Sequence, residues 1–325
     1  MQRSIARRAL VLAAAALPAL CLAQTDGEPK FPPLMKIVVP FSAGASNDAI
    51  ARVIAPLLAA QLGTTVIVEN RPGATGMIGA DFVAKSPPDG SVLLLTSSSF
   101  LTAAATQSRQ PYDALTSFTP VSMIGNGPMV LAVGASTPFK SATDLVSAAK
   151  AKPGVITFGT AGAGSIAHLA TEMFSDAAKI KMMHIPYKGA ANALLDMAGG
   201  QIDLMISNYS SIAPQIHAGK VQPLAITSAH LNPVFPDLPP LANVAPGFTA
   251  ENWVAVFVPA ATPAPMVTRL NQVLNQIAAT PEVKAILEPD GALPEAMTTS
   301  QLAARVKDDL QMWKKIAVDK KIFIE

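Results

Sequence analysis

The amino-acid sequence predicts an α/β protein with two similar lobes and a ligand cleft between them. Short β-branched runs alternate with helical segments, which is the pattern of parallel sheets covered by helices. The same order of strand, small-residue loop and helix occurs twice, in residues 36–99 and 155–211. The chain of 325 residues is also long enough for two domains, each with its own core.

The first 23 residues have the pattern of an export signal. Three arginines precede an uncharged run at 10–17, Pro18 interrupts this run, and Ala23 ends a small-residue motif, as in a cleavable signal peptide. We therefore expect a signal peptide at 1–23, cleavage near Ala23 and a periplasmic protein. Lipidation of Cys21 is the rival interpretation, although Leu20 is bulkier than lipoprotein signals have at that position.

Removal of this signal changes the net charge and the cysteine content, from which we infer the possible binding partners. The full chain has 24 basic and 22 acidic residues, and without the three arginines 21 basic residues remain, for a net charge of −1. The one cysteine also leaves, which excludes disulfides and thiol chemistry. The low charge and the 5% of aromatic residues predict no nucleic-acid partner. No later stretch has the ~20 uncharged residues of a membrane helix.

The first repeated unit has three strands, each followed by a loop or turn. Helical spacing of apolar residues follows the first strand until Gly63, and a second helix ends at Lys85. The expected parts are the strand 37–39, the loop 42–47, the helix to Gly63, the strand 65–69, the turn 70–73, the helix to Lys85, the strand 92–95 and the hydroxyl-rich loop 96–99.

The second unit repeats this order, and Gly189 stands where Gly73 stands in the first. Its expected parts are the strand 155–158, the loop 159–165, the helix to about Ala177, the strand 182–185, the turn 186–189, the helix to Met197, the strand 202–206 and the loop 207–211. In parallel sheets ligands gather at the carboxyl ends of strands, so the loops of both units predict the cleft.

The rest of the chain joins and completes the two lobes. We expect crossings near 130–135 and 251–259, and a tail with helices at 265–279, 281–287 and 299–319 that packs largely on the first lobe. Lobe 1 is then 35–130 plus 256–325, and lobe 2 is 131–255.

The loops indicate a ligand with a carboxylate. Two Gly/Ser-rich loops open helices, where free N–H groups and the helix dipole favour an anion. Lysine and arginine are absent from 41–47, 96–99 and 159–165, and Ser165-Ile166 replaces the Lys-Ser/Thr of a phosphate loop. A carboxylate suits such a site better than a polyphosphate. The four histidines have no metal-ligand spacing, so we expect no metal and no cofactor.

Several residues have two interpretations. Ser165 and His168 are three apart, as in a nucleophile–base pair, but a capped helix with a structural histidine is the simpler alternative. Asp48 could receive an amine or cap its helix, and Tyr187 could line the cleft or fill the edge of a core. Trp253 and Trp313 have the positions of packing residues.

The chain also resembles a known family. The segments that carry the resemblance are VVPFSAGASNDAIAR, VIVENRPGATGMIGADFVAKSPPDG, FGTAGAGSIAHLA and HIPYKGAANALLDMAGGQIDLM, in order along the chain. They look like those of Bug-type receptors, the extracytoplasmic solute-binding proteins of tripartite tricarboxylate transporters. This resemblance implies a type II periplasmic-binding-protein fold that holds a carboxylated solute between its lobes.

The resemblance also implies which loops meet the solute. They match 41–48, 96–98 and 160–165, to which we add two residues at the strand ends of lobe 2. One departure is Ala45, since the family usually has a double glycine where this chain has Gly44-Ala45. The expected ligand contacts are Phe41, Ser42, Ala43, Gly44, Ser46, Asp48, Thr96, Ser97, Ser98, Thr160, Ala161, Gly162, Gly164, Ser165, Tyr187 and Asn208.

We therefore expect a monomeric solute-binding protein that is not an enzyme. A small carboxylate would close the lobes, and the closed form would dock on the membrane subunits of a transporter. Two alternatives remain: a sensory receptor that presents solute to a signalling partner, and a periplasmic hydrolase-like enzyme that uses Ser165 and His168.

Overall fold

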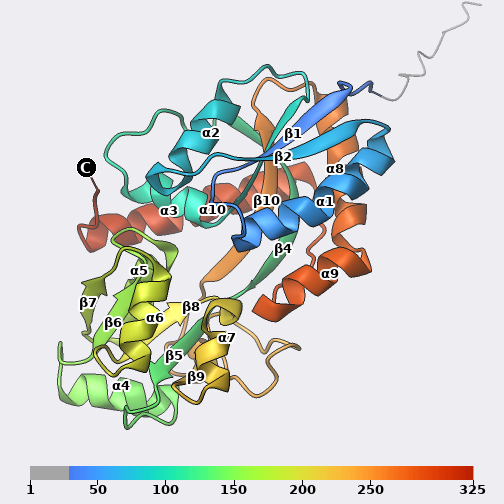
Figure 1. Ribbon diagram of the computed structural model, residues 1–325. Helices are drawn as coiled ribbons and strands as arrows, with labels where there is room; N and C mark the ends of the chain where they lie inside the picture. Colours follow the sequence, from blue (N-terminus) through green and yellow to red (C-terminus); the bar gives the residue numbers. More distant parts are fainter. Residues whose placement is uncertain (1–28, 325) are drawn as a thin grey trace, which may run out of the picture.

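Two five-stranded sheets organise residues 29–324, the part of the chain that the computed structural model describes. One sheet forms the core of lobe 1 and the other that of lobe 2, and the two lobes lie one above the other in Figure 1. The expected signal peptide and its cleavage site at Ala23 lie outside the described residues. Within these residues, no helix has both the length and the apolar character to span a bilayer.

Lobe 1 contains the sheet β2-β1-β3-β10-β4, in which β10 runs antiparallel to both neighbours. Its strands are β1 (Leu34–Val39), β2 (Thr65–Asn70), β3 (Val92–Ser97), β4 (Phe118–Pro128) and β10 (Glu251–Pro259). Its helices are α1 (Ser46–Leu62), η1 (Ala74–Gly76), α2 (Met77–Ala84), α3 (Ser99–Thr106), α8 (Ala264–Ala278), α9 (Pro281–Leu287), η3 (Glu288–Asp290) and α10 (Thr299–Asp319).

Lobe 2 contains the sheet β7-β6-β8-β5-β9, in which β5 is antiparallel to both neighbours. Its strands are β5 (Val130–Gly134), β6 (Thr157–Thr160), β7 (Met183–Pro186), β8 (Leu204–Ser207) and β9 (Val221–Ile226). Its helices are α4 (Ala142–Ala151), α5 (Ile166–Ala178), α6 (Ala190–Ala198), α7 (Tyr209–His217) and η2 (Leu241–Asn243).

The two sheets have the same strand order and direction, which confirms the internal repeat. A pair of glycines shows how closely the halves agree. Gly73 follows β2 with φ 126° and ψ 151°, and Gly189 follows β7 with φ 116° and ψ 151°. Only glycine adopts this backbone region readily. The two turns that the sequence pattern aligned therefore have one shared conformation.

Apolar helix faces cover both sides of the lobe 1 sheet. On one side α1, α8 and α9 bury their apolar residues against the strands, among them Ile54, Leu270 and Leu287. On the other side α2, α3 and α10 pack in a cluster that continues into α4 and α5 of lobe 2. Trp253 and Trp313 both lie in this continuous cluster and are 0% and 1% exposed, as expected of packing residues.

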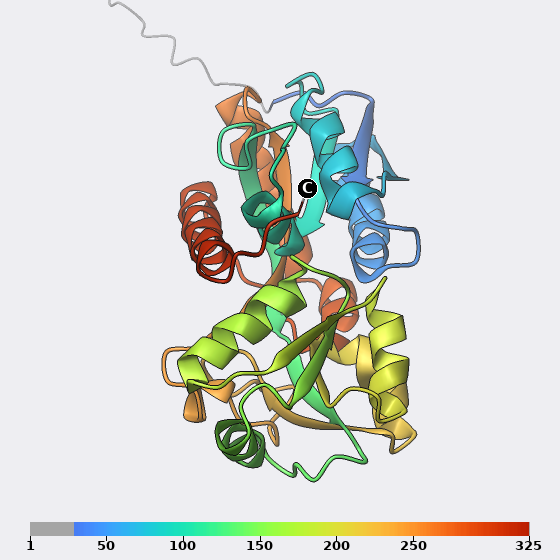
Figure 2. The same cartoon turned by 90° about the vertical axis from the view of Figure 1, so that its left-hand side faces the viewer.

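The chain passes between the lobes at two adjacent places. It leaves lobe 1 after Pro128 and enters lobe 2 at Val130, with Met129 hydrogen-bonded to Thr227 of the return connection. It returns before β10, whose nine residues all belong to the lobe 1 sheet, so the boundary expected at 255 falls inside this strand. The two crossings therefore form one hinge between the halves, which lie one above the other in Figure 2.

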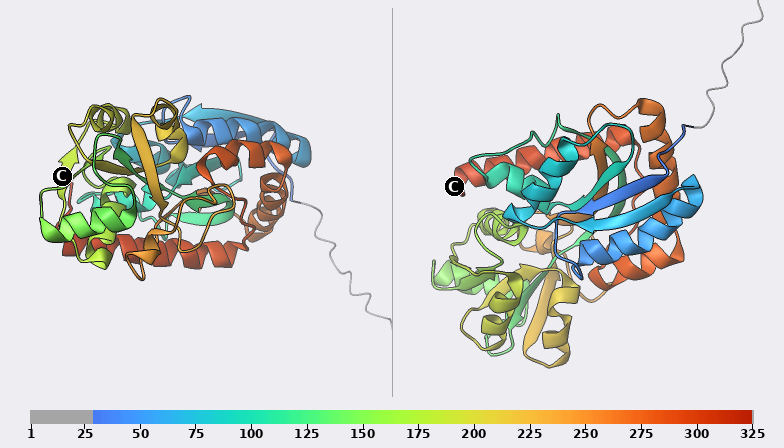
Figure 3. Two further views of the ribbon diagram at one scale, coloured as in Figure 1. Left: turned by 90° about the horizontal axis from the view of Figure 1, so that it is seen from below. Right: turned by 45° about the horizontal axis from the view of Figure 1, so that its top comes forward.

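Contacts of the C-terminal segment also link the lobes. Helix α10 runs along one side of the molecule (Figure 3), and Lys320 at its end pairs with Glu172 and Asp176 of α5. At the opposite edge of the interface, Asn232 of lobe 2 donates a hydrogen bond to the carbonyl oxygen of Gly291, just after η3.

Some element boundaries differ from the expected ones for physical reasons. The expected strand 155–158 is instead β6, at Thr157–Thr160, because Val155 is 63% exposed and only the later residues enter the sheet. Thr96 and Ser97 belong to β3, although we expected them in a loop. Helices α3 and α7 begin within segments whose serines and threonines favoured loops by composition, since burial of their apolar residues outweighs that preference.

We predict that Gly189→Ala lowers the free energy of unfolding by about 1 to 3 kcal/mol. A methyl group there would meet no atom within 4 Å, so the loss measures only the cost of the backbone conformation. The control is Gly199→Ala at the end of the same helix, where φ is −85°, a backbone conformation that any residue adopts, and where the added methyl group would lie 3.3 Å from the Leu195 carbonyl oxygen. Urea unfolding of the three proteins tests this prediction, and equal midpoints for Gly189→Ala and wild type would contradict it.

Candidate functional site

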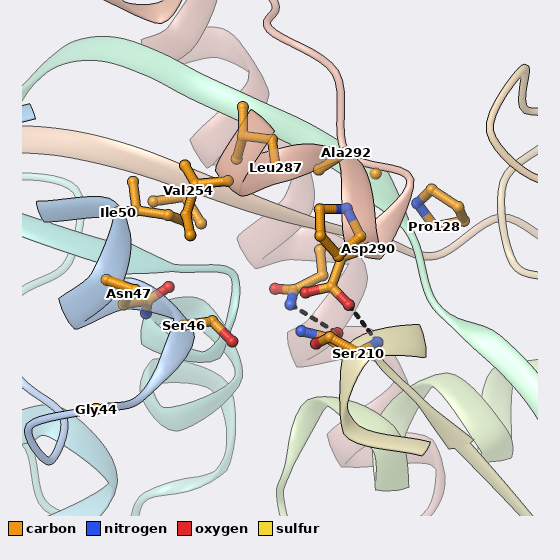
Figure 4. Close-up of a pocket in the computed structure, with 16 residues that line it drawn as sticks. Gly44, Ser46, Asn47, Ile50, Pro128, Ser210, Val254, Leu287, Asp290 and Ala292 are labelled. Atoms are coloured by element: carbon orange, nitrogen blue, oxygen red, sulfur yellow. Dashed lines mark hydrogen bonds between the residues drawn. The ribbon is translucent and has the colours of Figure 1, made fainter. Parts of the chain in front are cut away.

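A cavity of about 250 Å³ lies where the two lobes meet the hinge. Lobe 1 contributes the loop before α1, the first turn of this helix, and the segment of α9 and η3, while lobe 2 contributes the start of α7. The ends of β4 and β10 next to the hinge complete it. Its polar side chains, shown in Figure 4, are Ser46, Asn47, Asn208, Ser210, Asn252 and Asp290.

The loop before α1 is held in place by the carboxylate of Asp48. Its Oδ2 accepts hydrogen bonds from the Gly44 N–H at 2.8 Å and from Arg52 Nε at 3.0 Å, and its Oδ1 accepts one from Asn70 Nδ2 at 2.9 Å. Asn70 also donates to the carbonyl oxygen of Phe41. The hydrogen bond from Arg52 is the main cause that lowers the pKa of Asp48 to about 2, so the carboxylate stays charged.

Asp48 therefore acts on the loop and not as the N-cap of its helix. The N-cap position belongs to Ala45, which has no capping side chain, so the capping role that was one alternative for Asp48 is wrong. Gly44, at φ 84°, turns the chain back over the buried carboxylate. The first N–H groups of α1 are thus left without a side-chain cap at the wall of the cavity.

Asn47 is the most informative side chain of this wall. It is only 9% exposed, it lines the cavity, and its amide makes no hydrogen bond within residues 29–324. Its amide atoms are not fully buried, so they are open to the cavity. In Figure 4, Asn47 and Ser46 lie together at the start of α1, beside the open space. Together they give this wall amide and hydroxyl groups that a ligand can satisfy.

Two hydrogen bonds cross from lobe 1 to lobe 2 at the opposite wall. Asn252 of β10 donates through Nδ2 to Asn208 Oδ1 at 3.2 Å, and its own Oδ1 is buried without a partner. Asp290 of η3 accepts the Ser210 N–H at 2.7 Å. Both bonds appear as dashed lines in Figure 4. The second one places a carboxylate of the protein at the N-terminus of α7.

Three of the sixteen expected contact residues line this cavity: Gly44, Ser46 and Asn208. The hydroxyl-rich segment after β3 lies outside the lining. Ser98 is fully buried, and its hydroxyl accepts the Trp253 N–H and donates to the Glu251 carbonyl oxygen, which ties α3 to β10. Ser97 shares a hydrogen bond with Ser99, and Thr96 is 1% exposed within the sheet.

The glycine-rich loop before α5 also lies outside the lining and bonds mainly to itself. Ser165 is the N-cap, since its Oγ accepts the His168 N–H and donates to the Gly162 carbonyl oxygen. Thr160 is hydrogen-bonded to Gly162 and to the ring of His184. Gly164 donates its N–H to His168 Nδ1 at 3.1 Å. The exposed residues of this loop are Ala161 and Ala163.

This arrangement does not pair Ser165 with His168 as nucleophile and base. The Nδ1 atom of His168 faces the Gly164 N–H, and the Ser165 hydroxyl is used by the backbone. Tyr187 lies partly buried at the edge of the lobe 2 core, with its hydroxyl donated to Asp196 at 2.8 Å. Within residues 29–324, no group of three His, Cys, Asp or Glu side chains could hold a metal ion.

Four of the six polar side chains that line the cavity were not among the contacts expected from the sequence: Asn47, Ser210, Asn252 and Asp290. Asn47 stands in the expected loop, but its neighbours Ser46 and Asp48 were preferred. Ser210 and Asn252 follow or begin strands at the interface, and their positions at strand ends were the available signal. Asp290 had no signal, because it lies in the tail, 80 residues from the Ser210 N–H that it contacts.

The chain is similar throughout to a family of transport receptors. The sequence profile described as "Tripartite tricarboxylate transporter family receptor" matches residues 50–322. Among curated proteins, BugT of Bordetella pertussis (strain Tohama I) is 36% identical over 282 residues, which cover 86% of this chain and 86% of BugT.

Solved structures show the same similarity. R. palustris Rpa4515 with adipate is 33% identical and superposes with a TM-score of 0.78, over 89% of this chain and 98% of that one. The periplasmic binding protein BugD is also 33% identical, with a TM-score of 0.74 over 90% of this chain and 98% of its own. The two-lobed α/β fold of the binding proteins is therefore confirmed.

We predict that Asp48→Asn destabilises the protein by about 1 to 3 kcal/mol, because an amide nitrogen would then face the Gly44 N–H and the charged bond to Arg52 would be lost. Urea unfolding measures this loss. The control is Asp319→Asn, since Asp319 also forms an i,i+4 ion pair, with Lys315, but on the exposed surface and with the order of the charges reversed. Equal effects of the two substitutions would contradict the role given to Asp48.

We also predict that acid destabilises lobe 2 through two stacked histidines. The rings of His168 and His184 lie 3.7 Å apart, and burial is the main cause that lowers the pKa of each from 6.5 to about 4. Glu172 acts weakly in the opposite direction on His184. The unfolded chain takes up protons first, so stability is full above pH 6.5 and falls toward pH 4.

The expected loss over this pH range is a few kcal/mol, since one pKa unit corresponds to about 1.4 kcal/mol. His184→Phe keeps a ring in the stack but removes one titrating group, so it should reduce the slope of stability against pH. His217→Gln, at an exposed position, is the control and should keep the wild-type slope. Urea unfolding at several pH values tests this, and an unchanged slope in His184→Phe would disprove it.

Proposed function

Because this chain belongs to the tripartite tricarboxylate transporter family of receptors, we propose that it holds a small carboxylate in the cavity between its lobes. The observation that carries this proposal is the wall at the start of α1. There the amide of Asn47 lines the cavity and has no hydrogen-bond partner within residues 29–324, beside helix N–H groups that no side chain caps. A ligand carboxylate would satisfy both.

The electrostatics of this wall suit an anion without any basic side chain. The N–H groups in the first turn of a helix lack internal partners, and the helix dipole places partial positive charge there. Among the described residues that line the cavity, neither lysine nor arginine occurs. Recognition would therefore use backbone amides, the Ser46 hydroxyl and the amides of Asn47 and Asn252, which are directional groups that fix the orientation of the carboxylate.

The position of the cavity at the hinge connects binding to closure of the lobes. Lobe 2 contributes Asn208 and Ser210, so a ligand that contacts both walls stabilises the closed arrangement. In the function we propose, the exported monomer binds its solute in the periplasm after cleavage near Ala23, and the closed form docks on the membrane subunits of a transporter. BugD is described as a periplasmic binding protein, which supports this location.

The remaining expected contacts stay predictions. Residues 96–98 and 160–165 could reach a ligand only if it extended beyond the cavity. A sensory receptor would use the same binding step with a signalling partner. The hydrolase-like alternative has little support, because the Ser165 hydroxyl and the His168 ring serve the backbone of their own loop.

We predict that the protein, refolded to remove any carried ligand, binds at least one member of a panel of small mono- and dicarboxylates in calorimetry. Asn47→Ala should weaken this binding about 10- to 100-fold, which is the usual worth of a hydrogen bond to a charged group. Asn243→Ala, at an exposed position outside the cavity, is the control and should keep the wild-type affinity.

Two results would contradict the proposed function. The first is a folded protein that binds no carboxylate of the panel. The second is turnover of an ester or amide probe that Ser165→Ala abolishes, which would establish the hydrolase-like alternative.

A further inference from the structure

Polar and apolar side chains line different parts of the cavity, and this asymmetry bears on the ligand. Ser46 and Asn47 make a polar wall at the start of α1, and the polar side chains of the opposite wall are Asn208, Ser210, Asn252 and Asp290. The apolar part is made by Ile50, Val254, Ile286, Leu287 and Pro289, which come from α1, β10 and the segment of α9 and η3. Figure 4 shows Val254, Leu287 and Ile50 grouped on one side of the open space. An alkyl or aryl group would be buried there favourably.

The second helix start at the cavity is already occupied by an anion of the protein. Asp290 Oδ1 accepts the Ser210 N–H at 2.7 Å, at the N-terminus of the nine-residue helix α7. The partial positive charge of this terminus is thus neutralised from within the chain. A ligand carboxylate at this wall would find the N–H group taken and a like charge beside it.

No basic side chain among the described residues of the lining could balance a second negative charge. Of the described residues around the cavity, Asp290 is the one charged side chain. The loop before α5, the other expected anion site, lies outside the lining, and its Gly164 N–H is bonded to His168. A second carboxylate near the start of α7 would therefore lie beside the charge of Asp290 with no basic group to balance it, which is costly in a confined site.

The cavity, of about 250 Å³, has room for a small carboxylate such as hexanoate or benzoate.

We infer that the ligand has a single carboxylate, bound at the start of α1, and a small uncharged apolar body, which contacts Ile50, Val254 and Leu287. This inference rests on the proposed function and narrows it. The family name refers to tricarboxylates and Rpa4515 was solved with adipate, a dicarboxylate, so Asp290 would act here as the residue that excludes the second charge.

The test compares matched pairs of ligands that differ by one carboxylate: hexanoate with adipate, butanoate with succinate, and benzoate with terephthalate. Calorimetry on the refolded full-length mature protein should show tighter binding of the monocarboxylate in the best-binding pair, by about tenfold or more, because a like charge beside Asp290 opposes the second carboxylate.

Asp290→Asn tests the cause. The substituted side chain keeps an oxygen that can accept the Ser210 N–H but loses the charge, so the preference for the monocarboxylate should fall about tenfold. Asp237→Asn, at an exposed position outside the cavity, should keep the wild-type preference. Circular dichroism spectra of both variants check that they are folded.

The outcomes separate this inference from the proposed function. If a dicarboxylate binds as tightly as its matched monocarboxylate or more tightly, the inference is wrong while the proposed function stands. The same holds if Asp290→Asn leaves the preference unchanged. If no ligand of either class binds to the folded protein, both the proposed function and the inference are wrong.

Discussion

The buried carboxylate of Asp48 is the interaction on which the cavity depends. It stands in the first turn of α1, yet it reaches back to the Gly44 N–H and across to Arg52 and Asn70. This arrangement fixes the loop from Phe41 to Gly44 and leaves the first N–H groups of α1 without a side-chain cap. The negative charge of Asp48 therefore does not oppose an anion in the cavity, because its carboxylate contacts the loop and is paired with Arg52.

The N-termini of α1, α5 and α7 face the interface between the lobes, and their first N–H groups have different partners. The start of α1 is open. The start of α5 is capped by Ser165, and the loop before it is held through the ring of His168. The start of α7 is met by Asp290 from the other lobe. Since all three have the same helical physics, the difference comes from the side chains that contact each helix start. One open start among three gives the cavity one preferred place for a negative charge.

The same contacts relate the site to the movement of the lobes. Asn208–Asn252 and Ser210–Asp290 cross the interface beside the hinge, and Lys320 joins α10 to α5 at the opposite edge. A ligand in the cavity would add to the first two contacts, whereas opening of the lobes would break them. Ligand binding can therefore shift the equilibrium between the open and closed lobes toward the closed one through a small number of polar contacts.

The sequence by itself determined the α/β class, the twofold repeat and the loop before α1, because these follow from local patterns: β-branched runs, helical spacing, and turns such as the one at Gly73 that only glycine allows. It also determined that the expected site loops contain no lysine or arginine. Only the tertiary structure decided which polar groups remain free. Ser98 and Thr160 have the composition of ligand contacts but bond to the chain's own backbone or to His184, and Asp290 reaches the start of α7 from 80 residues away. Hydrogen-bond partners and burial depend on residues distant in sequence, so a local sequence pattern cannot predict them.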